Sequence, residues 1–525
     1  MALLEVSDLS VALDGVKRLD NLRFTLEAGE RLGIFGENGA GKSLLLQAVA
    51  GLLPREAMVT GAVSIDGAPI PANESERAKL RGKRIGIIVQ HGGLDPMLTI
   101  GELIVAALVR AGKVEDAEKR VVPVLADVGL EADLALLYPA DLTPGQQRLV
   151  DITIALAGEP ELLIADDPGN GLDLFELRRA ADLIARHCAS RKMSLLVTSH
   201  DLKLISALST KVMVLKAGAI AELVEKTLLF TYPRNEHTRK LVTAGRLRPK
   251  TLMRAPIGPP LLEVANLSKQ YSIEGTLPFV PAASVPALDN VSLVLRTGES
   301  VALMGAAGAG KSTLARTVAG LDLARSGEIK FDTATYHGAD LPRMFRRDIS
   351  FVFADPLESF DPSRPVGDSV AEPLRLEPQR LAEEISERIV EILGAVGVPH
   401  DLLSRYPRDL TRGQLQRLAI ARALITKPRL IVLDDPTGTL DVLARGETLL
   451  LLNRLRDDFG MTFLIVTQDF EVAQAVSDRV MVMDRGRIVE TGAPAYLVDS
   501  PRDDVTKRLV AARLPDIATA QANPI

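Results

Sequence analysis

The sequence predicts two tandem copies of one α/β domain, each built around a mostly parallel β-sheet. The first observation is an internal repeat that spans almost all of the 525 residues. The second is the alternation, within each repeat, of short leucine- and valine-rich runs with longer segments of helical periodicity. The third is a glycine-rich turn, which in each repeat follows an apolar run and precedes a helical segment.

The repeat is carried by four pairs of segments that occur in the same order in both halves. They are LLEVSDLSV and LLEVANLSK, GENGAGKS and GAAGAGKS, YPADLTPGQ and YPRDLTRGQ, and LLIADDPGNGLD and LIVLDDPTGTLD. We therefore expect a first domain at residues 1–245 and a second, with a C-terminal tail, at 261–525. Residues 246–260 are rich in proline and lack periodicity, which is typical of a linker.

The apolar runs predict the strands of the two core sheets. Continuous apolar strands suit a mostly parallel sheet that is covered on both faces. A long, helix-patterned segment between the second and third runs of each copy indicates an inserted helical subdomain. The runs lie at 31–35, 85–89, 162–165, 195–198 and 212–215 in the first copy, and at 300–304, 349–353, 430–433, 463–467 and 480–483 in the second.

Composition and charge narrow the function classes. The formal net charge is -6, which argues against a nucleic-acid partner, because such proteins carry basic faces. Cys188 is the single cysteine, so no intrachain disulfide forms. No apolar run approaches the roughly 18–20 residues that cross a bilayer. The N-terminal segment has no basic n-region typical of a secretory signal. We expect an intracellular, soluble protein that reaches a membrane only by docking to partners.

Two segments match the phosphate-binding pattern GxxxxGK[ST], in which glycines let backbone N–H groups converge on phosphate oxygens. In this pattern the lysine reaches the β- and γ-phosphates of a nucleotide and the hydroxyl ligates Mg²⁺. The candidate nucleotide-binding residues are Gly36, Asn38, Gly39, Gly41, Lys42, Ser43 and Leu44 in the first copy, and Gly305, Gly308, Gly310, Lys311, Ser312 and Thr313 in the second.

A carboxylate at the end of an apolar strand downstream of the glycine-rich loop is expected to make a second Mg²⁺ contact. Asp166 and Asp434 occupy this place in the two copies. The expected metal ligands are thus Ser43 and Asp166 in the first copy and Ser312 and Asp434 in the second.

The turns LTPGQ at 142–146 and LTRGQ at 410–414 resemble the LSGGQ signature of the ATP-binding cassette (ABC) superfamily. The resemblance covers nearly the whole chain. It implies a duplicated P-loop NTPase fold with an N-terminal antiparallel β region in each copy, and ATP and Mg²⁺ as cofactors. In that family each ATP lies between one glycine-rich loop and the signature of the opposite cassette. Site one would pair loop 36–43 with Thr411, Gly413 and Gln414, and site two would pair loop 305–312 with Thr143, Gly145 and Gln146.

Three further segments resemble the importers of peptides, nickel and opines within this superfamily. They are the YPxDL text before each signature, NEHTRKLVTAG from Asn235 and DDVTKRLVAARLP from Asp503. The resemblance implies an ATPase that drives import of peptides or related small solutes, metallophores included. Its partners would be two membrane permease subunits and an extracytoplasmic binding protein. It would lie at the cytoplasmic face of the inner membrane, held there through the permeases.

The two copies depart from the family pattern in different ways. The residue after the Mg²⁺ aspartate, usually a glutamate that polarises water, is Asp167 in one copy and Asp435 in the other. A carboxylate shorter by one methylene retracts by about an ångström, which can cost roughly 10²-fold in rate. The family's γ-phosphate-sensing histidine matches His200, whereas the second copy has Gln468 at that position.

Two other positions extend this asymmetry. The glutamine that contacts Mg²⁺ and signals to the membrane subunits matches Gln90 and is replaced by Ala354. The aromatic residue that stacks on adenine is Tyr271 in the second copy, and Leu13 replaces it in the first. We hypothesise that site one, with Gln90, Asp167 and His200, is the working ATPase. Site two, with Asp435, would bind ATP with little turnover.

Two other function classes stay open on the sequence alone. Soluble tandem cassettes that act on ribosomes also lack membrane spans, although they usually carry a long charged linker and a basic surface. A degenerate ATP-binding scaffold is the other alternative, because both copies lack the usual glutamate.

Overall fold

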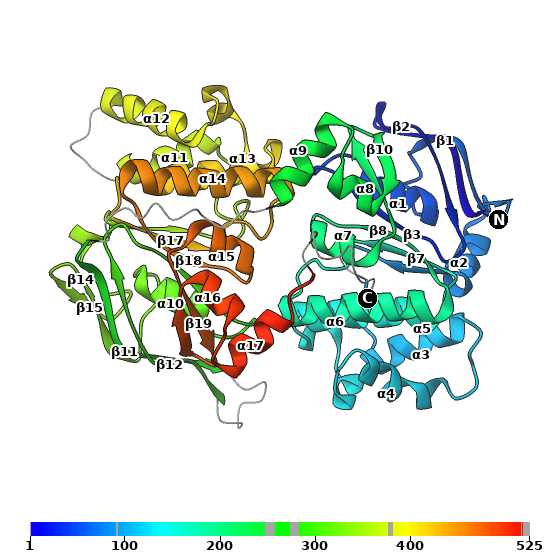
Figure 1. Cartoon of the computed structure of the whole chain (residues 1–525), viewed down its shortest axis with the longest axis horizontal. Helices are drawn as coiled ribbons and strands as arrows, with labels where there is room; N and C mark the ends of the chain where they lie inside the picture. Colours follow the sequence, from blue (N-terminus) through cyan, green and yellow to red (C-terminus); the bar gives the residue numbers. More distant parts are fainter. Residues whose placement is uncertain are drawn as a thin grey trace. The chain divides into compact units, whose positions relative to one another are not determined.

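The structure is a computed structural model that describes residues 2–90, 93–246, 258–273, 283–375, 382–515 and 517. The chain forms two compact units, built mainly from Met1–Gly245 and from Arg246–Leu440 with Ala444–Ala511 (Figure 1). Each unit contains one copy of the repeat. Most of the expected linker, residues 247–257, lies outside the described residues.

The core of the first unit is a six-stranded sheet with the order β10-β9-β3-β8-β7-β6. All neighbouring strands are parallel except β10, which pairs antiparallel with β9. Leu163 and Ala165 face one apolar cluster and Leu162 and Ile164 the other, which explains why the strand is apolar throughout. The strands are β3 (Arg31–Phe35), β6 (Ile85–Ile88), β7 (Leu162–Asp166), β8 (Ser194–Thr198), β9 (Lys211–Lys216) and β10 (Ala219–Glu225).

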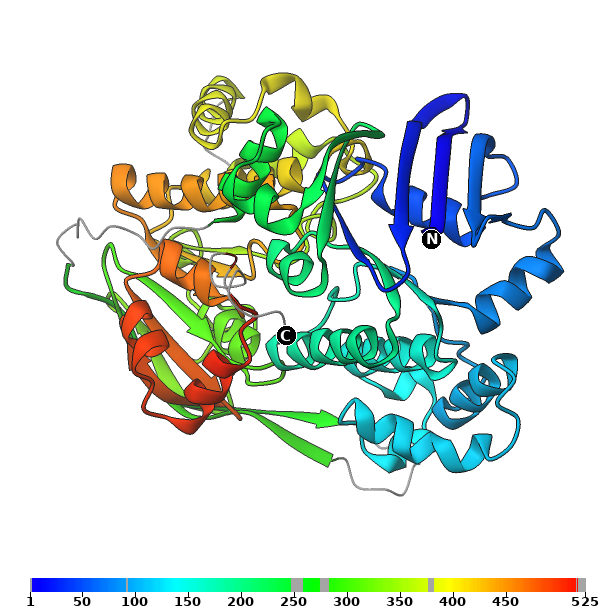
Figure 2. The same ribbon diagram turned by 45° about the vertical axis from the view of Figure 1, so that its right-hand side comes forward.

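An antiparallel sheet, drawn in blue in Figure 2, covers one face of this core together with α1. Its order is β2-β1-β4-β5, from β1 (Ala2–Leu13), β2 (Val16–Glu27), β4 (Met58–Ile65) and β5 (Ala68–Pro69). The inserted helices α3 to α5 lie between β6 and β7 in the chain. The helices are α1 (Lys42–Ala50), α2 (Glu74–Lys83), α3 (Ile100–Arg110), α4 (Ala117–Asp127), α5 (Pro144–Ala157), α6 (Leu174–Arg191), α7 (Leu202–Leu208), α8 (Lys226–Thr231) and α9 (Glu236–Gly245), with 3₁₀ turns at Ala132–Leu136 and Pro139–Asp141.

The second unit repeats this topology. Its core sheet has the order β16-β17-β18-β13-β19-β20 and its antiparallel sheet the order β12-β11-β14-β15. The strands are β11 (Pro260–Ile273), β12 (Ala283–Arg296), β13 (Ser300–Met304), β14 (Ser326–Phe331), β15 (Ala334–Tyr336), β16 (Ile349–Val352), β17 (Leu430–Asp434), β18 (Thr462–Val466), β19 (Arg479–Asp484) and β20 (Arg487–Gly492).

The helices of the second unit follow those of the first, except that a 3₁₀ turn stands where the first unit has α2; α11, α12 and α13 lie between β16 and β17. The helices are α10 (Lys311–Val318), α11 (Val366–Arg375), α12 (Ala382–Val396), α13 (Arg412–Leu424), α14 (Val442–Phe459), α15 (Phe470–Val476), α16 (Pro494–Asp499) and α17 (Asp504–Ala511), with 3₁₀ turns at Arg343–Phe345, His400–Ser404 and Pro407–Asp409. The duplicated fold that the sequence predicts, with parallel core sheets, antiparallel regions and inserted helices, is confirmed.

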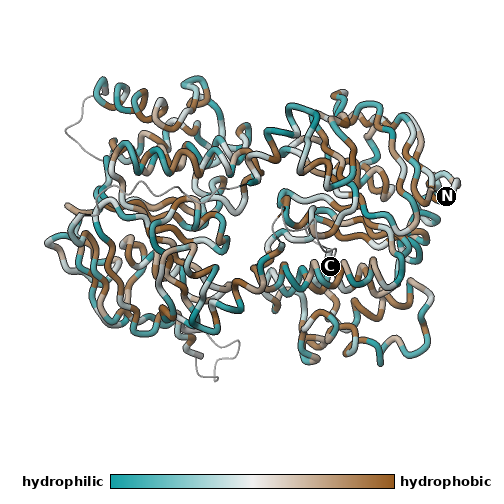
Figure 3. Tube along the Cα trace, viewed as in Figure 1, coloured by the Kyte–Doolittle hydropathy of each residue, from teal (hydrophilic) through white to brown (hydrophobic). Residues whose placement is uncertain are grey.

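Apolar residues, brown in Figure 3, run through the core strands of both units. Within the part of the chain that the structure describes, no helix is long and apolar enough to cross a membrane. Three strands end one residue earlier than predicted: β6 at Ile88, β16 at Val352 and β18 at Val466. Just outside β6, the Val89 carbonyl accepts a hydrogen bond from the Arg148 guanidinium.

Candidate functional site

Both glycine-rich loops connect the carboxyl end of a central strand to a helix, β3 to α1 and β13 to α10. Gly41 and Gly310 cap these helices with φ of 100° and 97°, in the left-handed region that favours glycine. Side chains are also excluded by space, because a Cβ at Gly36 would lie 2.4 Å from the Leu215 carbonyl oxygen. Each loop therefore runs directly into the N-terminus of a helix without side chains at its tightest points. This is the arrangement in which backbone N–H groups can bind a phosphate.

The loop lysines are held against their own loops. Lys42 Nζ donates hydrogen bonds to the carbonyl oxygens of Gly36 and Glu37, both at 2.7 Å. Lys311 Nζ does the same in the second copy, at 2.9 Å from Gly305 O and 2.6 Å from Ala306 O. Burial lowers the pKa of Lys42 below its ordinary value. Each ammonium group is thus held at its own loop by two backbone carbonyl oxygens.

The expected Mg²⁺ ligands of the first copy come together in one cavity. Ser43, Gln90 and Asp166 line a pocket of about 360 Å³ that also exposes apolar side chains of α1 and β6. A hydroxyl, an amide and a carboxylate supply oxygen donors, which Mg²⁺ prefers. Among the described residues, no group of three or more His, Cys, Asp or Glu side chains could hold a metal ion. The donors present therefore fit Mg²⁺ shared with a phosphate better than a metal held by protein alone.

Asp167 is the centre of a hydrogen-bond network in the first copy. It is buried, and its Oδ1 accepts from Ser199 Oγ at 2.9 Å while Oδ2 lies 2.7 Å from His200 Nδ1. Burial raises the pKa of this carboxyl, but the positive charge of His200 and the hydrogen bonds from His200 and Ser199 outweigh burial and lower it. The carboxylate is therefore ionised and fixed in position at neutral pH.

Asp166 is held from the adjacent strand. Thr198 Oγ1 donates to Asp166 Oδ1 at 2.6 Å and accepts from the Asp167 backbone N–H at 3.1 Å. The last residue of β7 and the aspartate that follows it are thus positioned by Thr198, which ends β8, and by the next two residues, Ser199 and His200. Parallel strands place these carboxyl ends side by side.

The second copy lacks this network. Asp434 is bonded to Ser312 Oγ at 2.9 Å, which unites the two expected Mg²⁺ ligands of this copy. Burial and the neighbouring charge of Asp434 raise the pKa of Asp435 to about 6. No side chain in the described part of the chain donates a hydrogen bond to the Asp435 carboxylate, and Val466 stands where the first copy has Thr198. Gln468 does not replace the contact that His200 makes.

The signature turns have the same local structure in both units. Thr143 caps α5 and Thr411 caps α13, each in a reciprocal capping box with Gln146 or Gln414. Both threonine side chains therefore stand at a helix N-terminus. The glycines within these turns face different neighbours, however.

A Cβ at Gly145 would lie 2.1 Å from the Glu176 carboxylate, and one at Gly413 would lie 2.8 Å from Ala444 Cβ. A carboxylate therefore lies beside the first signature and a methyl group beside the second. Neither glycine could be replaced without displacing its neighbour.

Tyr271 lies on β11, with its side chain partly exposed. Its hydroxyl donates to Asp322 Oδ2 at 2.7 Å, and Lys269 Nζ lies 4.8 Å from the ring centroid. The cation holds the ring in place and leaves an aromatic surface near the end of β11.

Three residues that order these sites carry no recognised motif and were missed by sequence reasoning. Thr198 and Ser199 precede His200 directly, so a polar triplet at a strand end was the available signal. Arg148, which donates to the Asp166 and Asp167 carbonyls at 3.0 and 2.6 Å, gives no sequence signal, because arginine is common on helices.

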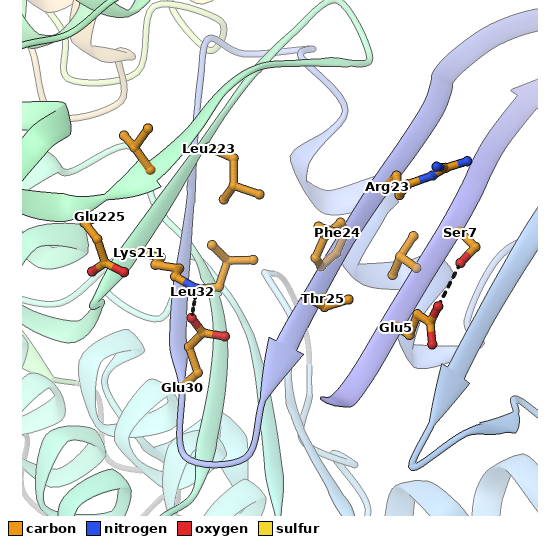
Figure 4. A pocket seen from close by; sticks show the side chains of 12 residues that line it. Glu5, Ser7, Arg23, Phe24, Thr25, Glu30, Leu32, Lys211, Leu223 and Glu225 are labelled. Carbon is orange, nitrogen blue, oxygen red and sulfur yellow. Dashed lines mark hydrogen bonds and ion pairs between the residues drawn. The ribbon is translucent and has the colours of Figure 1, made fainter. Parts of the chain in front are cut away.

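A second cavity, of about 550 Å³, lies in the first unit at the opposite edge of the core sheet. Figure 4 shows Phe24, Leu32 and Leu223 along its wall and the ion pair between Glu30 and Lys211, 2.5 Å long. Phe24 is on β2 and Leu223 on β10, while Glu30, Leu32 and Lys211 lie at the amino ends of β3 and β9. The glycine-rich loop follows the carboxyl end of β3. The cavity is therefore separate from the candidate nucleotide site.

Comparison with known proteins agrees with this geometry. The ABC transporter family matches the chain twice, at residues 19–170 and 288–438. The peptidoglycan transport ATP-binding protein YejF of Agrobacterium fabrum is 32% identical over 97% of this chain and 96% of its own length. The glutathione import ATP-binding protein GsiA of Escherichia coli K12 is 30% identical over 97% of this chain and 89% of its own. The oligopeptide transport ATP-binding protein OppD of Mycobacterium tuberculosis is 30% identical, covering 97% and 98%. Two matches to the family, two glycine-rich loops and relatives of similar length lead to one conclusion: the chain belongs to the ABC transporter family, as an ATPase with two ATP-binding cassettes in one polypeptide.

Proposed function

We propose that this protein powers the import of peptides or peptide-like small solutes through two partner permease subunits, with substrate delivered by an extracytoplasmic binding protein. Relatives that match almost the full chain are named for transport of peptidoglycan, glutathione and oligopeptides, which supports this substrate class. Docking to permeases would hold the protein at the cytoplasmic face of the inner membrane. Nucleic acid is not among its partners in this proposal.

Each ATP is proposed to be bound by the glycine-rich loop of one cassette and the signature of the other. Site one then uses loop 36–43 with Thr411, Gly413 and Gln414, and site two uses loop 305–312 with Thr143, Gly145 and Gln146. Threonine hydroxyls and helix N-termini at both signatures supply donors for phosphate oxygens. Tyr271 would stack on the adenine of site two.

Mg²⁺ in site one would be held by Ser43, Gln90 and Asp166, and in site two by Ser312 and Asp434. When bound, the ion neutralises charge that develops on the β- and γ-phosphate oxygens. The protein contributes the rest of the chemistry. Lys42 orients the phosphates, Asp167 polarises the attacking water, and His200 fixes the Asp167 carboxylate and lies where the γ-phosphate is sensed.

Site one is proposed to carry most of the turnover. The observation that supports this assignment is the Asp167 carboxylate bonded to both Ser199 and His200, for which Asp435 has no equivalent. A carboxylate that is ionised and fixed by two side-chain donors can orient and polarise water, as Asp167 can. Among the described residues, no side chain donates a hydrogen bond to Asp435 in the way that Ser199 and His200 donate to Asp167.

The test compares Lys42→Ala with Lys311→Ala in the full-length protein. Loss of a phosphate-orienting charge in the active site lowers ATP turnover by about two orders of magnitude or more. We expect this loss for Lys42→Ala and a smaller loss, below about tenfold, for Lys311→Ala. Equal losses would contradict the assignment of turnover to site one. Co-purification of the tagged chain with membrane permeases, and not with ribosomes, tests the transport role separately.

A further inference from the structure

Arg148 lies one turn into α5, the helix that begins at the signature threonine, and is 6% exposed. Its guanidinium donates to four backbone carbonyls. The Asp166, Asp167 and Pro168 carbonyl oxygens lie at 3.0, 2.6 and 3.3 Å, and the Val89 carbonyl is in close contact with Nη1. The Asp151 carboxylate is 4.0 Å away, too far for a hydrogen bond. The backbone carbonyls are therefore the main partners of this buried cation.

These carbonyls belong to two segments that carry the candidate chemistry. Val89 directly precedes Gln90, which lines the cavity with Ser43 and Asp166. The other three carbonyls begin with the last residue of β7 and continue past the hydrolytic carboxylate. The planar guanidinium, with five donors in a fixed fork, suits several carbonyls at once. One side chain thus joins the signature helix, the segment before Gln90 and the Asp167 turn.

The second copy shows what this arginine adds. Asp435 adopts the same left-handed backbone as Asp167, with φ of 44° against 48°. The corresponding helix position in α13 is Gln416, whose amide oxygen and nitrogen are both buried without a hydrogen-bond partner. The turn therefore forms without an arginine. What Arg148 adds is the connection between the turn and the segment that carries Gln90.

The second copy connects its own loop differently. Arg422, on α13, donates to the Ser359 carbonyl at 2.6 Å and lies 4.9 Å from the Phe360 ring centroid. This contact ties the loop after β16 to the helix alone and does not reach Asp434 or Asp435. Ile154 stands at the equivalent position of α5. Within the described residues, only the first copy has a side chain that joins the segment before Gln90 to the turn that carries Asp167.

We propose that Arg148 is a positioning residue that couples the Gln90 segment to Asp167, so that a displacement of either moves the other. The inference rests on the proposed function, because it assumes that Asp167 acts in ATP hydrolysis. The coupling works through the backbone: Val89 and Asp167 share one donor group, and neither carbonyl can shift by more than a few tenths of an ångström without weakening its bond. A movement of the Gln90 segment, which is expected to signal to the membrane subunits, would thereby move the Asp167 carboxylate.

The central test uses Arg148→Gln, which installs the residue of the second copy, in the full-length protein. Misplacement of a catalytic group by about an ångström costs up to 10²-fold, so we expect kcat to fall by about 10- to 100-fold. The KM for ATP should stay within about twofold, because Arg148 touches neither the glycine-rich loop nor the signature turn. Arg148→Lys should lie between the two proteins, since an ammonium has three donors and cannot span both segments. Gln416→Ala is the matched control and should leave kcat unchanged.

Hydrogen–deuterium exchange separates coupling from a merely structural role. In the wild-type protein, a non-hydrolysable ATP analogue with Mg²⁺ should slow exchange in residues 36–43, 85–90 and 166–170. Arg148→Gln should keep the slowing at 36–43, which shows that the variant is folded and binds nucleotide, and lose it at 85–90. Arg148→Lys covers the case in which the glutamine variant does not fold, with partial loss at 85–90 expected.

Retained slowing at 85–90 in both variants, or full kcat in both, overturns the proposal. So does a parallel loss of kcat and of protection at 36–43 in both variants, because that pattern describes a general structural defect. Failure of the proposed function has another signature: Lys42→Ala would then leave ATP turnover unaffected. If Lys42→Ala is inactive while the Arg148 variants behave as wild type, only the coupling role is rejected.

Discussion

Replacing Asp167 by asparagine removes the charge at the centre of the first site while preserving its shape. The carboxylate lies 2.9 Å from Ser199 Oγ and 2.7 Å from His200 Nδ1, and an amide can accept from the serine through its oxygen. Its NH₂ group is a donor, so Nδ1 of His200 could bond to it only after losing its proton. The perturbation is therefore mainly the loss of a negative charge and of the hydrogen bond from His200.

The expected magnitude follows from the role assigned to the charge. General-base assistance contributes about 10²- to 10⁴-fold, which corresponds to roughly 3–5 kcal/mol of transition-state stabilisation. The pKa of Asp167 is lowered because His200 and Ser199 outweigh the effect of burial, so nearly all molecules carry the charge at pH 7.5 before substitution. We expect kcat of Asp167→Asn to fall by at least about 10²-fold.

Asp435→Asn is the matched control, since it removes the corresponding charge from the second copy. It should change kcat by less than about threefold, because Asp435 is not held by a donor equivalent to His200. The assay is steady-state phosphate release by the full-length protein at saturating Mg²⁺-ATP, with nucleotide binding measured alongside. Comparable losses in the two variants, or more than half of the activity left in Asp167→Asn, would refute the assignment of catalysis to Asp167.

Two further predictions concern buried titratable groups of the first unit. Burial, only partly offset by Arg148, raises the pKa of Asp151 to about 6. The folded protein therefore binds a proton at Asp151 more tightly than the unfolded chain does. It loses stability as pH rises from about 4 to about 6. Asp151→Asn should then raise the free energy of unfolding, measured by urea titration, by up to about 3 kcal/mol at pH 7.5. This gain should become smaller towards pH 4. A difference between the two proteins that does not change with pH would contradict the argument. Burial also raises the pKa of the Cys188 thiol to about 11, and its side chain is 5% exposed. Iodoacetamide at pH 8 should label the Cys188 thiol slowly in the folded protein and completely in guanidinium chloride, as measured by mass spectrometry. Rapid labelling of the folded protein would show that the thiol is not buried.

The sequence predicted the core strands because each is buried on both faces. Leu162 to Ala165 must be apolar throughout, and that pattern is visible without a structure. The predicted ends of β6, β16 and β18 each lay one residue too far along the chain, and the Val89 carbonyl just outside β6 accepts a hydrogen bond from an arginine of a distant helix. Tertiary contacts of this kind have no local signal.

In the candidate site, too, some residues could be predicted from local sequence and others depend on tertiary contacts. Lys42, Ser43 and Asp166 stand in motifs whose spacing is set by phosphate and Mg²⁺ geometry, so the pattern names them directly. Thr198 and Arg148 act through hydrogen bonds between elements far apart in the chain, and their partners depend on strand order. A single sequence does not give that order, so the partners of Thr198 and Arg148 could be found only in the fold.

The identical strand order of the two units, within a single polypeptide, has a consequence for how the protein can change. In an assembly of two identical chains, any mutation enters both nucleotide sites, so a loss in one is always a loss in both. Here a mutation alters one copy and leaves its twin intact. The replacement of histidine by glutamine at position 468, and of threonine by valine at 466, could accumulate without removing the network around Asp167. Two cassettes in one chain can therefore differ in sequence, and one site can change while the other keeps its hydrogen-bond network.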